Sequence, residues 1–346
     1  MHSLASFTTS VMKVLFPIGY WLLAIGYSLF FASCRLPSEK RNDRTPVTTE
    51  TKTSPKISAP QFNSDSAFLF VKQQVDFGPR VPGTLAHEKC ADYLAAKLRS
   101  YKLDVIVQKG MTTAYDNRQF ELKNIIGAYK PELKDRVLLC AHWDCRPIAD
   151  RDTKDTDKPI DGANDGASGV GVLLEIARNL NTVNPNIGVD IIFFDIEDYG
   201  QPHVDDASKE NTWCLGSQYW ARNPHRLGYY AKYGILLDMV GAAGATFMKE
   251  GGSEYYAPSV VTKVWNKAEE IGYSDYFSNI HTSAITDDHY YINTIAAIPT
   301  IDIIHMDTQT RDFFPFHHKH GDNMSVIDKN TLKAVGQTVM EVVYAE

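Results

Sequence analysis

The sequence has few cysteines, no block of basic residues and no internal repeat, and each absence excludes a class of protein. Five cysteines among 346 residues are too few for a fold held together by disulfides. The 35 Lys and Arg against 42 Asp and Glu give a net charge of −7, without the concentrated basic surface of nucleic-acid binding, so we expect no nucleic-acid partner. A 44% hydrophobic and 22% charged composition excludes collagen-like, coiled-coil and wholly disordered chains.

A long apolar run lies near the N-terminus, over residues 14–31, and a Phe-Ala-Ser-Cys sequence ends it at Cys34. Small residues directly before a cysteine are typical of a bacterial lipoprotein signal, in which cleavage precedes a cysteine that is then lipidated. We therefore predict a signal peptide over residues 1–33, with a true start at Met12 if the first residues are an over-long gene start. An uncleaved membrane helix is the alternative, because the run is just long enough to span a bilayer.

Residues 34–61 are predicted to be the lipidated cysteine and a flexible linker, because Ser, Thr, Pro, Lys and Glu dominate there and large apolar residues are almost absent. The catalytic domain is predicted over residues 62–346. Both interpretations of the N-terminus place this domain outside the cytoplasm, on the periplasmic face of a membrane or at the cell surface. We expect the membrane partner to be reached through the lipid on Cys34.

In the domain, segments with helical spacing alternate with short apolar runs. The runs are residues 137–141, 189–194, 234–240 and 298–304, with an alternating segment at 120–126, and the helical segments are residues 67–75, 86–101, 169–180, 213–222 and 260–271. This alternation predicts a single α/β domain with a central, mostly parallel mixed sheet flanked by helices. Ligands bind at the carboxyl ends of such strands, so we expect the chemistry directly after each run.

Acidic and imidazole side chains follow these runs. They are His142 and Asp144, Asp165 in a Gly-rich loop, the adjacent Glu197 and Asp198, Asp238 inside the third run, and His317, His318 and His320 beyond the fourth. Carboxylate and imidazole ligands suit a hydrolytic Zn²⁺, and no cysteine is placed as a soft ligand. One of two adjacent carboxylates can bind the metal while its neighbour stays free as a base.

Each of these residues alone has an ordinary structural explanation. Asp165 precedes a helix and could be its N-cap, and the histidine group could be a solvated polar loop. Asp238 is harder to explain, because a carboxylate inside an apolar strand is costly unless it is paired or metal-bound. The joint placement of all of them at one edge of the sheet is what predicts metal catalysis.

In this order along the chain, the residues resemble the zinc-dependent aminopeptidase family, with its zinc-exopeptidase-like fold. Further segments resemble glutaminyl-peptide cyclotransferases, or glutaminyl cyclases, of the animal-like type found in bacteria. These segments are residues 76–84, which include Phe-Gly-Pro-Arg, residues 236–242, and Asp287-Asp288-His289 followed by Ile298-Pro299. The resemblance runs from about Phe62 to the C-terminus.

The resemblance implies an acyltransferase that converts the N-terminal Gln of peptides or proteins into pyroglutamate and releases ammonia. Zinc would act as a Lewis acid and Glu197 as the general acid/base. By position, the family's one catalytic zinc would be held by Asp165, Asp198 and His318, with Asp238 and Asp287 as further catalytic residues that line the pocket.

Two departures from the animal enzymes concern the site. Asp198 stands where those enzymes have Glu, and His317 and, roughly, His203 stand where they have Trp. Trp143 and Trp213 are the candidates for the missing aromatic wall.

Two other functions remain open at this stage. A dizinc aminopeptidase, which releases N-terminal residues, would bind a second zinc through His142 and Asp238, and the chain holds a complete two-metal ligand set by residue type. A catalytically inactive binding protein would lack a ligand or the base, and none is missing. The disulfide state of Cys90, Cys140, Cys145 and Cys214 also stays open.

Overall fold

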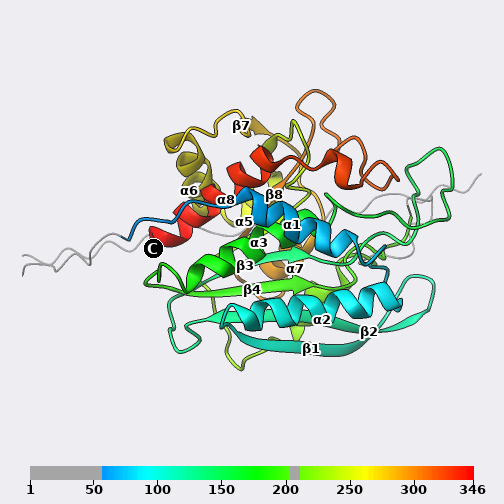
Figure 1. Ribbon diagram of the computed structural model, residues 1–346, viewed down its shortest axis with the longest axis horizontal. Helices are drawn as coiled ribbons and strands as arrows, with labels where there is room; N and C mark the ends of the chain where they lie inside the picture. The colour runs from blue at the N-terminus through cyan, green and yellow to red at the C-terminus, as the bar shows by residue number, and fades with distance from the viewer. Residues whose placement is uncertain (1–56, 203–210) are drawn as a thin grey trace, which may run out of the picture. The chain divides into compact units, whose positions relative to one another are not determined.

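The computed structural model describes residues 57–202 and 211–346 (Figure 1). The predicted signal peptide, Cys34 and the linker up to residue 56 lie outside the described residues, as does His203. The described residues belong to one compact unit, Ser54–Glu346, and Ile57 and Ala59 near its start already pack against the core. No helix in the two described stretches is long and apolar enough to cross a bilayer.

Helices and strands alternate along most of this unit. In chain order they are α1 (Ser64–Val75), α2 (Leu85–Ser100), β1 (Asp104–Thr113), β2 (Gln119–Tyr129), β3 (Arg136–His142), α3 (Ala167–Leu180), β4 (Gly188–Phe194), α4 (Leu215–Arg222), β5 (Gly234–Asp238), β6 (Phe247–Lys249), α5 (Gly251–Tyr256), α6 (Pro258–Glu270), β7 (Phe277–His281), α7 (Asp288–Thr294), β8 (Thr300–Ile304), the 3₁₀ turn η1 (Met324–Val326) and α8 (Lys329–Tyr344).

A six-stranded mixed sheet with the strand order β1-β2-β4-β3-β5-β8 forms the centre. Strands β4, β3, β5 and β8 run parallel to one another, whereas β2 is antiparallel to both β1 and β4. Strands β6 and β7 form a separate parallel pair. The predicted single α/β domain with a mostly parallel mixed sheet is therefore confirmed.

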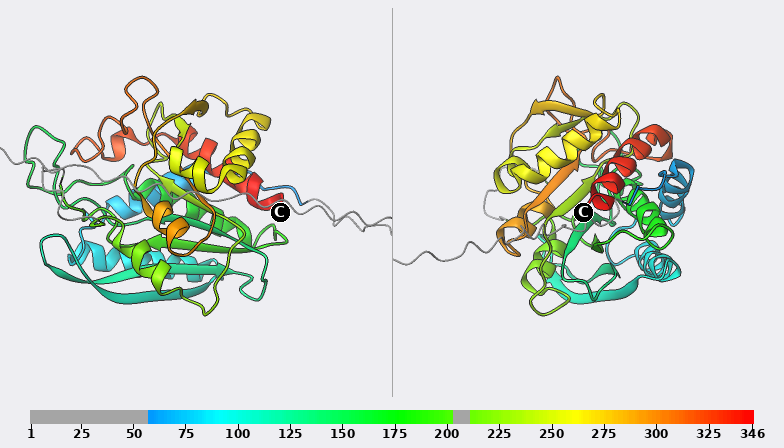
Figure 2. Two further views of the ribbon diagram at one scale, coloured as in Figure 1. Left: turned by 180° about the vertical axis from the view of Figure 1, so that it is seen from behind. Right: turned by 90° about the vertical axis from the view of Figure 1, so that its left-hand side faces the viewer.

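The continuous apolar runs of the sequence are the strands that helices cover on both faces. Side chains such as Leu139 and Phe193 point to one face, beneath α1, α2, α3 and α8. Their chain neighbours Leu138 and Phe194 point to the opposite face, beneath α4 and α7. Figure 2 shows these two helix layers on opposite sides of the sheet in the end-on view.

Strand β1 and helix α8 were not among the elements that the sequence predicted. Strand β1 is an edge strand whose residues are half-buried or exposed, so no continuous apolar run marks it. Helix α8 did leave a signal, because Asp328 caps its first turn and the buried Leu332, Val335 and Val339 recur at helical spacing.

The parallel strands place their carboxyl ends along one edge of the sheet. Strand β3 ends at His142, which lies opposite Phe194 at the end of β4, and β5 ends at Asp238. The loop before α3 brings Asp165 to the same edge, because α3 packs against β3 and β5. This edge is where the chemistry was predicted to lie.

Candidate active site

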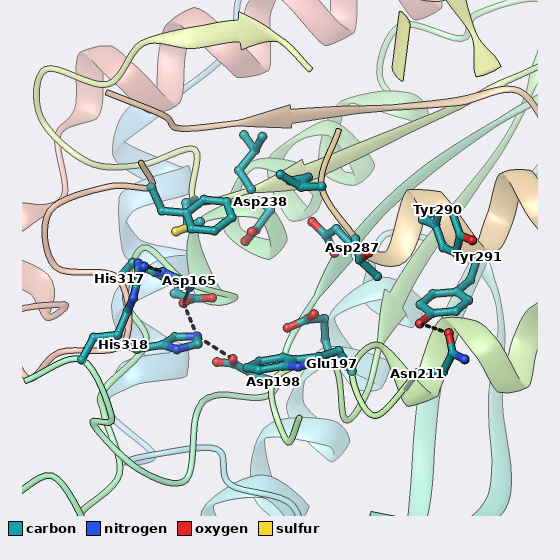
Figure 3. A pocket seen from close by; sticks show the side chains of 17 residues that line it. Asp165, Glu197, Asp198, Asn211, Asp238, Asp287, Tyr290, Tyr291, His317 and His318 are labelled. Atoms are coloured by element: carbon teal, nitrogen blue, oxygen red, sulfur yellow. Dashed lines mark hydrogen bonds and ion pairs between the residues drawn. The ribbon is translucent and has the colours of Figure 1, made fainter. Parts of the chain in front are cut away.

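The strand ends surround a cavity of about 570 Å³. All six residues that the sequence assigned to zinc binding or catalysis line this cavity: Asp165, Glu197, Asp198, Asp238, Asp287 and His318 (Figure 3). They come from five different loops and strand ends, so the tertiary structure brings together what the sequence spreads over more than 150 residues.

Asp165 and His318 belong, with His317, to a group of possible metal ligands, and Asp198 lies beside it in contact with His318. The Nε2 atom of His318 lies 3.0 Å from Oδ1 of Asp198 and 3.9 Å from Oδ2 of Asp165. The Oδ2 atoms of both aspartates are buried and accept no hydrogen bond from the described residues. Buried carboxylate oxygens without a donor need a cation nearby, and two carboxylates with one imidazole are a ligand set that Zn²⁺ accepts.

The two aspartates of this group are oriented by other buried carboxylates. Asp322 accepts the backbone N–H groups of Asn164 and Asp165, at 2.7 and 3.0 Å. In the same way, Asp144 accepts the N–H groups of Glu197 and Asp198, at 3.0 and 3.1 Å. Each loop that carries a possible ligand is thus held by two successive hydrogen bonds to one carboxylate. Asp144 was among the residues that the sequence singled out and Asp322 follows the histidine group closely, but the role of neither as an anchor could be predicted.

A third carboxylate, Asp150, orients His318. Its Oδ1 lies 3.2 Å from Nδ1 of His318, and its Oδ2 lies 2.7 Å from the guanidinium of Arg146. Burial opposes a charge on His318, but Asp198 and Asp150 outweigh it and raise the pKa of His318 to about 9. Zinc binding therefore has to displace a proton from this imidazole.

Arg146 is fully buried beneath the site and was missed by the sequence analysis. Besides Asp150, it donates to the backbone carbonyl of Asp198 at 2.8 Å, and its guanidinium lies 4.4 Å from the centre of the Trp213 ring. One cation thus positions a possible ligand loop, the carboxylate behind His318 and the aromatic wall. No local pattern distinguishes such an arginine from an exposed one.

His142 lies between two acidic residues. Its Nε2 is 3.0 Å from Oδ1 of Asp165 and 3.2 Å from Oδ1 of Asp238, so these three residues form a second group that could bind a metal, with Asp165 shared. Burial disfavours the charged imidazole, but contacts with Asp144, Asp165 and Asp238 raise the pKa of His142 well above its usual value. A protonated His142 compensates the charges of Asp165 and Asp238 by itself, so this group needs no second metal ion.

Glu197 and Asp238 are carboxyl groups that hold protons readily. Burial, reinforced by Asp198 and Asp287, raises the pKa of Glu197 well above its usual value. Burial likewise raises the pKa of Asp238 to about 7. The Glu197 carboxylate is also held in place, because the thiol of Cys214 donates a hydrogen bond to its Oε1 at 3.1 Å. Carboxyl groups with such pKa values can accept and donate protons near neutral pH.

Behind Asp287 lies a further polar cluster that the sequence analysis did not assign. Asp287 caps the N-terminus of α7, and ligand atoms of Asp287, His289 and Asp302 lie within 4.8 Å of one another. Burial raises the pKa of Asp302 well above its usual value, and Glu250 contacts His289 from the other side at 3.2 Å. Asp302 left the same signal as Asp238, an acidic residue inside an apolar run.

Three residues with left-handed backbone mark the sharp turns at this edge. They are Ile196, Met239 and His318, with φ of 52°, 48° and 56°. This conformation costs roughly 1–2 kcal/mol for a residue with a Cβ, and more for a β-branched one. Ile196 precedes Glu197, Met239 follows Asp238, and His318 is itself a site residue. The strained backbone at these positions directs the three site residues into the cavity.

The aromatic wall of the cavity includes Trp213. Its ring stacks on His318 with a centroid distance of 5.7 Å and an interplanar angle of 8°. Trp143, the other candidate, lies instead in the core, where it stacks on His87 and donates to the Lys123 carbonyl. Tyr290, Tyr291 and Phe313 also line the cavity, as does His317. The four described cysteines, Cys90, Cys140, Cys145 and Cys214, are buried and form no disulfide.

Comparison with known proteins identifies relatives of both kinds considered above. Residues 124–343 match the sequence profile of Peptidase family M28. Bacteroides thetaiotaomicron glutaminyl cyclase, solved bound to N-acetylhistamine, is 56% identical with a TM-score of 0.82, over 83% of this chain and 99% of that chain. Tannerella forsythia glutaminyl cyclase is 53% identical with a TM-score of 0.81, over 83% of this chain and 100% of that chain. The predicted resemblance to glutaminyl cyclases within a zinc-exopeptidase fold is confirmed.

Peptidases are also among the relatives. A leucine aminopeptidase precursor from Bacteroides thetaiotaomicron VPI-5482 is 55% identical with a TM-score of 0.81, over 84% of this chain and 99% of that chain. Aminopeptidase YwaD of Bacillus subtilis (strain 168) is 29% identical over 233 residues, which cover 64% of this chain. The chain spans 44% of the length of that curated relative.

We predict that His318→Ala lowers the affinity for zinc by more than about 100-fold. It removes a direct ligand, and even the loss of a residue that only hydrogen-bonds to a ligand costs roughly 10–100-fold. Calorimetric titration of the metal-free protein with zinc measures the affinity. His281→Ala is the matched control, because this ring pairs with Glu254 at 2.7 Å away from the cavity lining and should cost less than about tenfold. An equal loss in both variants would contradict the assignment of His318.

Proposed function

This chain belongs to Peptidase family M28, and we propose that it is a zinc-dependent glutaminyl-peptide cyclotransferase. It converts the N-terminal glutamine of peptides and proteins into pyroglutamate with release of ammonia. The proposal rests on one observation: the three possible zinc ligands lie at one side of the cavity, while Glu197, Asp238 and Asp287 form an acidic wall beside them. The similarity to solved bacterial glutaminyl cyclases supports it.

Asp165, Asp198 and His318 would hold one zinc ion. Their two donor-free carboxylate oxygens and one imidazole nitrogen fit such an ion by type and by burial. When bound, zinc supplies a Lewis acid for a carbonyl oxygen. Arg146 fixes the backbone of Asp198, the shorter residue that stands in place of Glu, by donating a hydrogen bond to its carbonyl oxygen.

Glu197 moves the proton in the proposed reaction. The α-amine of the substrate attacks the carbon of its own γ-amide, so a C–N bond forms within the ring and the bond to the amide nitrogen breaks. Glu197 takes one proton from the attacking amine and gives it to the departing nitrogen, which leaves as ammonia. Since both reacting groups belong to one residue, the substrate itself supplies their proximity.

Asp238 and Asp287 line the cavity beside Glu197, and burial raises the pKa of Asp238 to about 7. Carboxyl groups that are buried close together resist being ionised together, so some of them keep a proton at neutral pH. A protonated neighbour can donate a hydrogen bond to Glu197 or to the substrate, and an ionised one can receive a hydrogen bond from the α-amine. We assign these two hydrogen-bonding roles to the pair Asp238 and Asp287.

The direct test uses the chain from residue 35 onward, loaded with zinc and given a short peptide that begins with Gln. We expect mass spectrometry to show the loss of one ammonia with the peptide length unchanged, and elemental analysis to find one tightly bound zinc per chain. Release of the first residue, with two bound zinc ions, would favour the dizinc aminopeptidase. The group formed by His142, Asp165 and Asp238 is the observation that keeps this second function in consideration.

Glu197→Gln should lower kcat by roughly 10²–10⁴-fold, because the amide cannot take up the proton. Zinc content should stay unchanged, since Glu197 is not among the proposed ligands. Ammonia release and metal analysis on the same preparation measure both effects. Glu121→Gln, on the exposed side of β2, is the matched control and should keep full activity. Full activity of the Glu197 variant would remove Glu197 from the mechanism.

We also propose that the enzyme acts outside the cytoplasm as a lipoprotein, with residues 1–33 removed, Cys34 lipidated and the following residues as a tether. Exported polypeptides that begin with Gln would then be its substrates. The sequence ahead of Cys34 supports this proposal.

Detergent-phase partitioning of the full chain, with mass spectrometry of its N-terminus, tests the lipid anchor. We expect the natural chain in the detergent phase with a modified Cys34. Cys34→Ala should lose the modification, whereas the matched linker variant Ser38→Ala should keep it. A natural chain without lipid on Cys34 would contradict the anchor.

A further inference from the structure

This inference rests on the proposed function, in which only the first residue of the substrate reacts inside the cavity. The rest of the substrate chain therefore has to leave the cavity over its rim. Two sides of this rim differ in character. On the side of His317, the charged Arg151 contacts the His317 ring at 2.8 Å and Asp312 at 3.3 Å. On the opposite side, Tyr290 and Tyr291 line the cavity (Figure 3).

Further tyrosine rings extend the side of the rim that holds Tyr290 and Tyr291 outward from the cavity. Tyr291 is buried and packs edge-on against Tyr290, with ring centroids 5.2 Å apart. Tyr290 in turn lies 6.5 Å from Tyr256, and Tyr256 lies 4.8 Å from Tyr255, both again edge-on. Tyr255 is 79% exposed. Four rings thus form a continuous path from the cavity into solvent.

Two different elements supply this path. Tyr290 and Tyr291 belong to α7, and Tyr255 and Tyr256 end the short helix α5. Among the described residues, the hydroxyls of Tyr255, Tyr256 and Tyr290 make no hydrogen bond. Exposed aromatic side chains with free hydroxyls offer both apolar contact and hydrogen bonds to a bound peptide.

A single buried carboxylate fixes α5 against the cavity wall. Glu250 accepts the backbone N–H groups of Gly252 and Ser253, each at 2.6 Å, and that of Ile285 at 2.8 Å. Because Ile285 lines the cavity, the start of α5 and the wall share one anchor. The short helix that carries Tyr255 and Tyr256 is therefore anchored at its start before any substrate binds, which lowers the entropy that binding has to overcome.

We propose that Tyr255, Tyr256 and Tyr290 form a subsite for the second and third residues of the substrate. It would favour aromatic or large apolar side chains there and would hydrogen-bond to the peptide backbone. The separations of 6.5 and 4.8 Å along the path each correspond to between one and two residues of extended chain, at roughly 3.4 Å per residue, so neighbouring rings can face successive substrate residues. The inference rests on the proposed function and adds a substrate preference to it.

The test compares kcat/KM for glutamine amide, Gln-Gly-Gly-Gly-amide and Gln-Phe-Leu-Gly-amide, measured with the zinc-loaded chain from residue 35 onward. We expect the Phe-Leu peptide to exceed the Gly peptide by roughly tenfold, mostly through KM. In the double variant Tyr255→Ala with Tyr256→Ala, the ratio of the Phe-Leu peptide to glutamine amide should fall by a similar factor. The matching double change to Phe keeps the rings and should retain most of the preference.

Tyr230→Ala is the control for loss of an exposed tyrosine, because Tyr230 is 59% exposed and precedes β5 at the other end of the sheet. It should leave the ratio unchanged. Equal kcat/KM for the two tetrapeptides in the natural enzyme would overturn the subsite, and so would a double Ala variant that lowers all three substrates alike. Absence of ammonia from glutamine amide itself would overturn the proposed function and the subsite with it.

Discussion

The burial of many carboxyl groups at one edge of an apolar sheet is the constraint on which the rest of the site depends. A buried carboxylate needs hydrogen-bond donors, a cation or a proton. Asp144 and Asp322 receive pairs of backbone N–H groups, and Asp150 receives Arg146. The oxygens of Asp165 and Asp198 that receive nothing are the ones that suit a metal ion. Carboxylates that receive hydrogen bonds therefore serve as anchors, whereas carboxylate oxygens that receive none are the possible metal ligands.

Glu197, Asp238 and Asp302 are carboxyl groups that burial compensates with protons, and this gives the site its proposed chemistry. Burial raises the pKa of Glu197, of Asp238 and of Asp302, so protons are held next to the possible zinc ligands rather than excluded from them. A cyclisation that expels ammonia consumes no water and needs only a proton carrier and an electrophile activator. Solved structures of both a glutaminyl cyclase and an aminopeptidase precursor share this backbone, and we expect the number of metal ions and the location of the protons to distinguish the two activities.

The site residues were predictable because their signals are local. A short apolar run that ends in an acidic or imidazole residue marks a strand end, and parallel strands bring such ends to one edge. Asp165, Glu197, Asp198, Asp238, Asp287 and His318 all follow this pattern or belong to a recognisable segment, and all line one cavity. Their roles as ligands or proton carriers stay predictions. Trp143 and Trp213 looked equivalent in the sequence, and only their packing separates the buried ring from the one that covers His318.

The α/β architecture, the edge of the sheet that carries the chemistry and the residue types found there were all predictable, because hydrophobic periodicity and strand ends are encoded by near neighbours. Which buried charges pair with one another could be seen only in the tertiary structure. Glu250 contacts His289 and the backbone of Ile285, and the tyrosines of α5 meet those of α7 across more than 30 residues of chain. Such contacts depend on how loops pack over the sheet, and that packing is set by the whole core rather than by any local pattern.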